Sequence, residues 1–362
     1  MTSVVENVLV AVATIGLQER AWPQKPPGPS EWPEILRGLD THRLTGLAAL
    51  AVESGRLVLD DGQLAELAIS DVRSAKSTVA AEAAMLDLAD RLDGERVPFR
   101  VLKGSAAAQL DWSIPDRRRH IDTDLLVRGD DLAGVVAIAK RVGASRRVPE
   151  LRPGFDQRFA KSVTMDSSRG GIDLHRSLVV GPHCFLVNID DLWAEPRAFG
   201  VCSRDLLGVA APAAHVHYAM HATFTGAQRL GNLRDFVECA CHADLDAAAA
   251  LARRWRATAV VKQACEHVRD RLRFSRDHEL VRWGASLAPT DDEYRLAASY
   301  GQASRNAAAL ARASLRYVPG LPDKLRFAYA VAWPSKANRA TRRRSPSDQA
   351  SRLRQHLRRW RA

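Results

Sequence analysis

The residues best suited to chemistry are Asp122 and Asp124, which are separated by a single threonine. Residues 121–127 (IDTDLLV) alternate as a β-strand does, and side chains at i and i+2 of a strand project from the same face. Two neighbouring carboxylates repel each other, and a divalent cation that prefers oxygen ligands, Mg²⁺ or Mn²⁺, relieves that repulsion. We therefore expect a metal site on this face, with Ile121 and Leu125 on the opposite, core face.

A Gly-Ser pair stands upstream of these acids, at Gly104 and Ser105. Residues 97–102 (VPFRVL) alternate like a strand, and residues 105–110 follow as a helix, so the pair lies at a strand-to-helix turn. The N-terminus of a helix offers unpaired backbone N–H groups, and glycine lets a phosphate approach the backbone closely. The pattern predicts a phosphate-binding turn.

A third carboxylate, Asp173, lies within residues 171–178, which we predict to form another strand, and His175 is on the same strand. A phosphate-binding turn, a carboxylate pair and a third carboxylate are the parts required for two-metal phosphoryl or nucleotidyl transfer. The combination is much more specific than any one of its parts.

The elements that must position these residues divide the chain into four parts. The apolar spacing predicts helices before residue 96, strands alternating with helix after it, and helices again beyond Arg204. The expected strands are 97–102, 121–127, 157–166 and 171–178, with a helix at 130–142. The expected parts are an N-terminal helical region (1–95), an α/β core (96–203), a C-terminal helical domain (204–320) and a basic tail (321–362).

Composition excludes several classes of protein. A chain of 362 residues that is 46% hydrophobic and 26% charged is typical of a folded globular protein, not of a disordered, fibrous or disulfide-stapled one. We expect no membrane span, because no apolar run approaches the roughly 18 residues that a span requires. The five cysteines lack CxxC spacing, which favours a reduced, cytoplasmic protein.

The net charge of +11 belongs to one end of the chain. Residues 324–362 hold 12 of the 53 basic residues and one of the 42 acidic residues, so the remaining chain has 41 of each. A basic tail of this kind attracts nucleic acid, phosphorylated ligands or anionic lipid, and the alternative is a solvated end that aids solubility.

Four segments together resemble one known family. They are VPFRVLKGSAAAQL (97–110), RRRHIDTDLLV (117–127), GIDLHRSL (171–178) and LGNLRDF (230–236). They are similar to the bacterial uncharacterised nucleotidyltransferase family, which belongs to the polymerase-β-like nucleotidyltransferase superfamily. The resemblance runs from about residue 32 to residue 235. It implies a fold of the α/β (α+β) class, in which a mixed sheet of the nucleotidyltransferase fold is flanked by helical regions.

The resemblance also implies roles for individual residues. Gly104 and Ser105 would hold the β- and γ-phosphates of a nucleotide, and Asp122 and Asp124 would hold two Mg²⁺ (or Mn²⁺) ions. Asp173 would complete one metal site and help to deprotonate the acceptor. Further candidate phosphate contacts are Lys103, Arg118 and Arg119, for which the alternative is a solvated loop.

A weaker group of candidates would face the acceptor. His175 shares a strand with Asp173, and His217 and His221 stand at i and i+4 of one predicted helix face. These histidines have no HExxH pattern, so packing or acceptor contact is favoured over a zinc site. Asp235 is a candidate general base, with an ion pair as the alternative.

The sequence thus predicts an enzyme that moves a nucleoside monophosphate from a nucleoside triphosphate, ATP included, to an acceptor, with release of pyrophosphate. The acceptor is open: a small molecule, a protein or RNA. One alternative is a toxin-like nucleotidyltransferase that modifies RNA and binds it through the basic tail. Another is a non-catalytic nucleotide-binding scaffold, against which the retention of all three acids argues.

Overall fold

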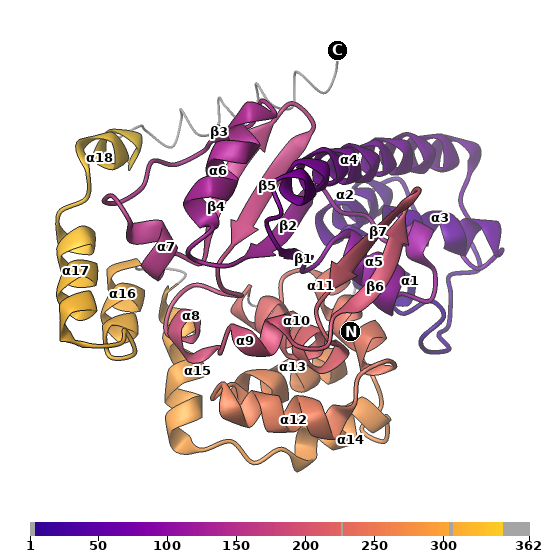
Figure 1. The fold of residues 1–362 in the computed structure, drawn as a ribbon. Coiled ribbons are helices and arrows are strands. Elements are labelled where there is room, and N and C mark those ends of the chain that lie inside the picture. The colour runs from indigo at the N-terminus through magenta and orange to yellow at the C-terminus, as the bar shows by residue number, and fades with distance from the viewer. Residues whose placement is uncertain (1–3, 226, 304–306, 343–362) are drawn as a thin grey trace.

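A mixed sheet forms the centre of the fold (Figure 1). The computed structural model describes residues 4–225, 227–303 and 307–342. Within them seven strands pair in the order β3-β4-β5-β2-β1-β7-β6, in which β2–β5 and β1–β7 are parallel and the other pairs antiparallel. The strands are β1 (Phe99–Val101), β2 (Asp122–Val127), β3 (Ser145–Arg146), β4 (Ser162–Ser167), β5 (Gly170–His175), β6 (Arg197–Val201) and β7 (Arg204–Gly208). The expected α/β (α+β) class with a mixed sheet is confirmed.

Helices precede the sheet, as expected, and the described residues form four of them: α1 (Val4–Ala13), α2 (Trp32–His42), α3 (Thr45–Glu53) and α4 (Asp61–Gly94). The longest, α4, begins at a capping box, in which the Asp60 side chain accepts from the Gln63 backbone N–H and the Gln63 side chain accepts from the Asp60 N–H. In its second half Met85, Leu88 and Leu92 recur at helical spacing and are buried.

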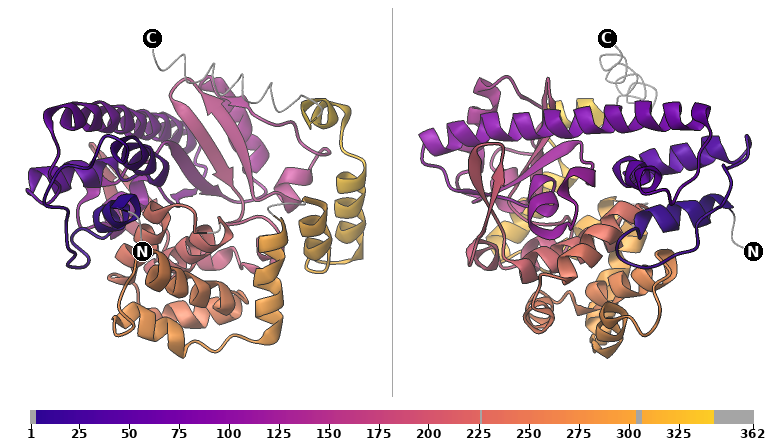
Figure 2. Two further views of the ribbon diagram at one scale, coloured as in Figure 1. Left: turned by 180° about the vertical axis from the view of Figure 1, so that it is seen from behind. Right: turned by 90° about the vertical axis from the view of Figure 1, so that its right-hand side faces the viewer.

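One face of the sheet is covered by α4 and by α6 (Leu132–Arg141), which share a hydrophobic core with the strands. Figure 2 shows α4 running along the side of the sheet opposite to the C-terminal helices. The shorter elements between and after the strands are α5 (Ser105–Asp111), the 3-10 turn η1 (Pro115–Arg117), α7 (Phe155–Phe159), α8 (His183–Leu186) and α9 (Asp190–Trp193).

The other face of the sheet meets a larger helical core. It consists of α10 (Ala211–Phe224), α11 (Leu230–Ala240), α12 (Leu245–Arg254), α13 (Thr258–Arg271), α14 (Glu279–Ser286) and α15 (Asp291–Ala303). The next helix, α16 (Ala307–Leu315), packs instead against a smaller apolar cluster that includes Phe155, Phe159 and Phe327. Buried side chains of α1, α2 and α3 belong to the same hydrophobic cluster as those of α10 to α14. The N-terminal and C-terminal helices therefore pack together, although the sheet separates them in sequence.

The chain continues into α17 (Leu321–Ala332) and α18 (Lys336–Arg342), which lie at the left of Figure 1. Residues 343–362 of the predicted basic tail lie outside the described residues. Phe327 of α17 packs on Phe155 and Phe159 of α7. This contact corrects the strand expected at 157–166: the two phenylalanines stand at i and i+4, so the segment starts as a helix, and the strand begins at Ser162.

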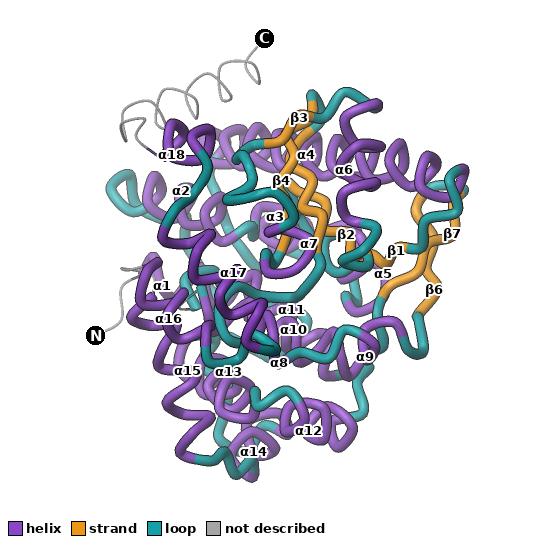
Figure 3. The backbone as a smooth tube through the Cα atoms, turned by 60° about the vertical axis from the view of Figure 1, so that its left-hand side comes forward, coloured by secondary structure: helices purple, strands orange, loops and turns teal. Residues whose placement is uncertain are grey.

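Two further expectations need correction. Strands β6 and β7 form a hairpin at the end of the sheet (Figure 3), so residues 204–208 are strand rather than helix. Ile121 is 49% exposed, because β2 begins one residue later and Ile121 has no place in the paired ladder, whereas Leu125 is buried as expected.

Among the described residues, no helix has the length and apolarity needed to cross a membrane. The division into four parts stays a prediction.

Candidate active site

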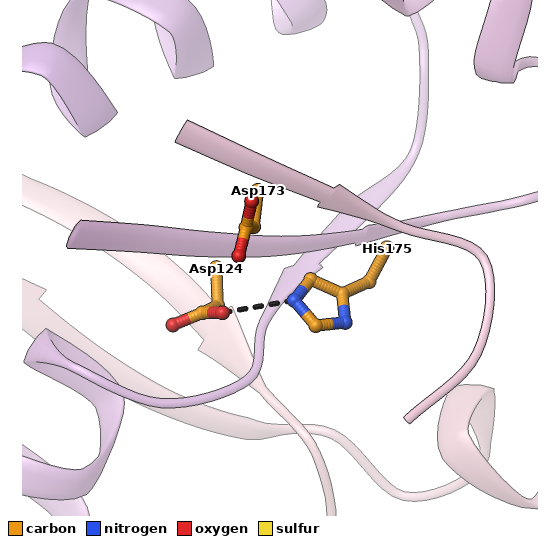
Figure 4. Close-up of side chains that lie close together, drawn as sticks. All are labelled: Asp124, Asp173 and His175. Atoms are coloured by element: carbon orange, nitrogen blue, oxygen red, sulfur yellow. Dashed lines mark hydrogen bonds and ion pairs between the residues drawn. The ribbon is translucent and has the colours of Figure 1, made fainter. Parts of the chain in front are cut away.

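The pairing of β2 with β5 brings two of the predicted acids together. The strands are parallel, and Asp124 lies opposite Asp173, while Asp122 lies opposite Gly171. Because side chains alternate along a strand, all three acids project from the face that meets the C-terminal helices. Ligand atoms of Asp124, Asp173 and His175 lie within 4.8 Å of one another (Figure 4).

Asp124 is the most enclosed of the acids, and it is 2% exposed. Its Oδ1 accepts from Lys103 Nζ at 3.0 Å and lies 2.8 Å from His175 Nε2. Burial alone would raise the pKa of this carboxyl, but the charge of Lys103 and the His175 contact hold it well below its usual range. Asp124 is therefore ionised.

His175 is wholly buried, and both ring nitrogens are engaged. Its Nδ1 lies 3.0 Å from the Ser177 carbonyl, which can only accept, so Nδ1 carries a hydrogen. When Nε2 is protonated, it donates a hydrogen bond to Asp124. When Nε2 is deprotonated, its lone pair can bind a metal ion together with Asp124. Metal-binding histidines commonly have this second contact to a carbonyl, which fixes the ring.

The other two acids have weaker partners. Asp173 Oδ1 accepts from the Thr164 hydroxyl at 2.5 Å. Asp122 lies at the more open end of the strand, with a side chain that is 37% exposed and 3.7 Å from the Arg43 guanidinium. The two carboxylates are thus accessible to a ligand, whereas Asp124 is anchored from behind.

The Gly-Ser turn is built as the sequence predicts, directly before α5. Gly104 has φ of 62°, in the left-handed region that favours glycine, and a Cβ there would stand 3.2 Å from the His120 ring. Ser105 is buried, with its hydroxyl 3.4 Å from His120 Nε2. Burial, with Arg118 and Arg43 nearby, lowers the pKa of His120 to about 3, so the ring beside the turn is neutral.

The predicted phosphate contacts Arg118 and Arg119 are each held by a carboxylate. Arg118 donates to both oxygens of Asp235 at 2.8 Å and to the Gly104 carbonyl at 2.9 Å. Arg119 donates to both oxygens of Asp71 at 2.9 and 2.8 Å. Burial disfavours the charge of Arg118, but the pair with Asp235 outweighs it and raises the pKa. Both arginines brace the loop that carries them.

The acceptor-side candidates separate into two places. Asp235 is 7% exposed, lines a small pocket with Arg118, and also accepts from the Trp112 indole N–H at 2.7 Å. His217 and His221 lie on α10, over the face that carries Asp124. Burial, followed by the charge of Lys103, holds the pKa of each well below its usual range. His217 Nδ1 is buried with no hydrogen-bond partner among the described residues.

Three residues near these groups were not predicted. Lys161 is close enough to Lys103, Asp124 and Asp173 to interact with their charges, and burial lowers its pKa. Arg43 and Asn232 line a small pocket together with Trp112, Arg118, Arg119, Gly231 and Asp235. Asn232 stands within the LGNLRDF segment, which was a usable signal, but no spacing in the sequence marks Arg43 or Lys161.

The chain is similar to proteins of one known family. A family model described as uncharacterised nucleotidyltransferase matches residues 28–273, which is more than half of the chain. A search of curated proteins finds no match. Among solved structures, the antibiotic-resistance factor ANT(2'')-Ia, determined in solution, is similar with a TM-score of 0.36 and 13% identity. That similarity covers 51% of this chain and 96% of the other.

Proposed function

The chain belongs to the uncharacterised nucleotidyltransferase family, and from this premise we propose that it transfers a nucleoside monophosphate from a nucleoside triphosphate to an acceptor hydroxyl or other oxygen. In this reaction the acceptor oxygen forms a bond to the α-phosphorus, and the bond from that phosphorus to the bridging oxygen breaks. Pyrophosphate leaves, and the acceptor proton passes to a base.

The observation that carries the proposal is the adjacency of Asp124 and Asp173 on β2 and β5, on the same face as Asp122. The donor set fits a divalent cation of the Mg²⁺ or Mn²⁺ class, because the carboxylate oxygens are the hard ligands that these ions prefer. Such an ion, when bound, would offset the charge on the phosphate oxygens and orient the triphosphate.

The chain's own residues have separable tasks in this proposal. Lys103 and His175 fix Asp124 in position and keep it ionised. Asp173 completes the ligand set and is a base for the acceptor proton, because its contact is a neutral hydroxyl that leaves its charge available. The Gly104 turn lets the triphosphate approach the start of α5.

The acceptor would enter from the side of α10. His217 and His221 face Asp124 from this helix, and the unpartnered Nδ1 of His217 is a hydrogen-bonding group that an acceptor can satisfy. Burial lowers the pKa of both rings well below the usual range, so each is neutral at pH 7 and can donate one hydrogen bond and accept another.

The test is transfer of label from α-³²P nucleoside triphosphates, with Mg²⁺ or Mn²⁺, in a lysate depleted of nucleotides. Wild-type protein should label a small molecule, a protein or RNA, and the labelled species identifies the acceptor class. Asp173→Asn should label nothing, while Asp205→Asn, an exposed aspartate on β7, should match wild type. Absence of label with all four nucleotides, together with no nucleotide-dependent rise in melting temperature, would refute the proposal and favour a non-catalytic module.

A further inference from the structure

The pocket beside the Gly104 turn has an excess of hydrogen-bond donors that the structure leaves unused. Its lining comes from four separate segments: the end of α2, the end of α5, the loop after η1 and the first turns of α11. Two of its three arginines are committed, since Arg118 and Arg119 each bind both oxygens of a carboxylate. The remaining donors belong to Arg43 and Asn232.

Arg43 has the least committed guanidinium in the pocket. Its ion pair with Asp122 spans 3.7 Å, and it makes no hydrogen bond to a described side chain. The residue ends α2 at φ of 60°, in the left-handed region that glycine adopts freely, so a glycine at this position would suit the backbone.

Asn232 supplies an independent observation. It is 7% exposed, and its Nδ2 is buried without a hydrogen-bond partner among the described residues. An unpaired buried amide is unfavourable, so an acceptor on a ligand in the pocket would recover the lost hydrogen bond. Its position is set by Gly231, where a Cβ would stand 2.6 Å from the His42 carbonyl, so only glycine lets α11 begin against the end of α2.

The chemistry of the pocket selects an anion. Asp235, the carboxylate in the lining, already accepts from Arg118 and Trp112. What remains is a guanidinium, an amide N–H group and the N-terminal end of α11, all of which favour negative charge. The cavity volume is about 20 Å³, far below the roughly 300–1,000 Å³ of pockets that enclose whole drug-sized ligands. The space is too small for a nucleoside, and its donors favour a single anionic group.

We propose that Arg43 and Asn232 form the subsite for the terminal phosphoryl group of the nucleoside triphosphate. This inference rests on the proposed function, because it places that group next to the Gly104 turn and the metal-binding acids. The pocket adjoins both: Arg118 in its wall donates to the Gly104 carbonyl, and Arg43 reaches toward Asp122. Asp122 would be among the residues that hold a metal ion, and Arg43, whose ion pair with it is long, would then be available to a phosphate.

Calorimetric titration of the full chain with ATP, ADP and inorganic tripolyphosphate, each with Mg²⁺, tests the inference. Arg43→Gly suits the local backbone, so the fold is retained, and it should weaken ATP and tripolyphosphate by about tenfold or more while leaving ADP unchanged. Asn232→Leu should weaken the same two ligands and raise the melting temperature of the ligand-free protein. Arg37→Ala, an exposed arginine on α2 with the same loss of charge, is the matched control.

The outcomes separate the inference from the function on which it rests. Wild-type protein that binds ATP, with Arg43→Gly equal to it, would overturn the subsite and leave the proposed function standing. Equal weakening of ATP and ADP would also overturn it, because Arg43 would then contact an inner phosphate. Wild-type protein that binds none of the three ligands would refute the proposed function and the subsite together.

Discussion

The buried pair of Arg118 and Asp235 offers a direct test of whether these residues serve a ligand or the fold. Their side chains are 8% and 10% exposed, and Asp235 also accepts from Trp112. Removing one partner of a buried ion pair leaves an uncompensated charge, which costs about 3–5 kcal/mol. We expect Arg118→Met and Asp235→Leu each to destabilise the protein by that amount.

The double variant Arg118→Met/Asp235→Leu should be less destabilised than the sum of the two single variants, because it removes both charges at once. Trp112 and the Gly104 carbonyl still lose their partners, so some cost of about 1–3 kcal/mol per group remains. Urea unfolding followed by tryptophan fluorescence measures all four proteins. Arg141→Met, which breaks an exposed pair with Glu95, should change stability by less than about 1 kcal/mol.

One result would refute this reasoning. If Arg118→Met unfolds at the wild-type urea concentration but no longer binds ATP, Arg118 is a phosphate ligand, as the sequence predicts, and its bond to Asp235 contributes little to the fold. If it unfolds earlier and the double variant recovers part of the loss, the pair is a brace between the Gly104 turn and α11.

Three further predictions follow from the site and its surroundings. Asp124→Asn should abolish transfer and lower the melting temperature, because Lys103 is left buried without its carboxylate. Asp173→Asn should also abolish transfer but should change the melting temperature little, because it breaks only a hydrogen bond to a hydroxyl. Equal losses of stability in the two variants would contradict this. Gly104→Ala should destabilise the protein by about 1–3 kcal/mol through its left-handed φ and its contact with His120, and should weaken ATP binding in the same titration; wild-type affinity would contradict this. Burial lowers the pKa of His215 to about 3, so between about pH 6.5 and pH 3 the unfolded chain binds more protons than the folded chain. The free energy of unfolding therefore decreases as the pH is lowered through that window, by up to about 1.4 kcal/mol per pH unit. His215→Phe, which keeps the stack on Phe236, should flatten the dependence of the urea midpoint between pH 8 and pH 5; parallel curves would contradict this.

The sequence predicted the strands that carry the acids well, because the acids and their apolar neighbours follow the two-residue period of a strand. That period predicts that Asp122 and Asp124 share a face, and the register of β2 and β5 adds Asp173, which lies opposite Asp124. The β6–β7 hairpin was missed although the same period was present, with Phe199, Val201 and Leu206 buried between exposed residues. A short strand next to a long helical stretch is easily assigned to the helix.

The partners of the site residues could not be predicted, because they depend on contacts between distant segments. Arg43 is 79 residues before Asp122, and Arg118 is 117 residues before Asp235. Those contacts arise because α1 to α3 share one hydrophobic core with α10 to α14, an arrangement that local periodicity does not contain. The resemblance indicated which segments carry the candidate site residues. The folded chain determines which of those side chains already have hydrogen-bond or ion-pair partners within the protein.

The carboxylate pair illustrates how far the chain itself offsets a charge that the sequence assigns to a metal ion. Two adjacent acids repel, yet the Asp124 carboxylate forms an ion pair with Lys103 and contacts His175, and Asp122 faces Arg43. Repulsion within the D-x-D motif therefore does not by itself require a cation. Asp173 differs, because its hydrogen bond comes from a neutral hydroxyl and its carboxylate lies beside that of Asp124. Among the described residues, no cation forms a hydrogen bond to Asp173, so a metal ion bound there would offset a charge that the chain itself leaves largely unpaired. Asp173→Asn therefore tests metal-dependent catalysis more directly than a substitution of Asp122 or Asp124, which would also break an ion pair.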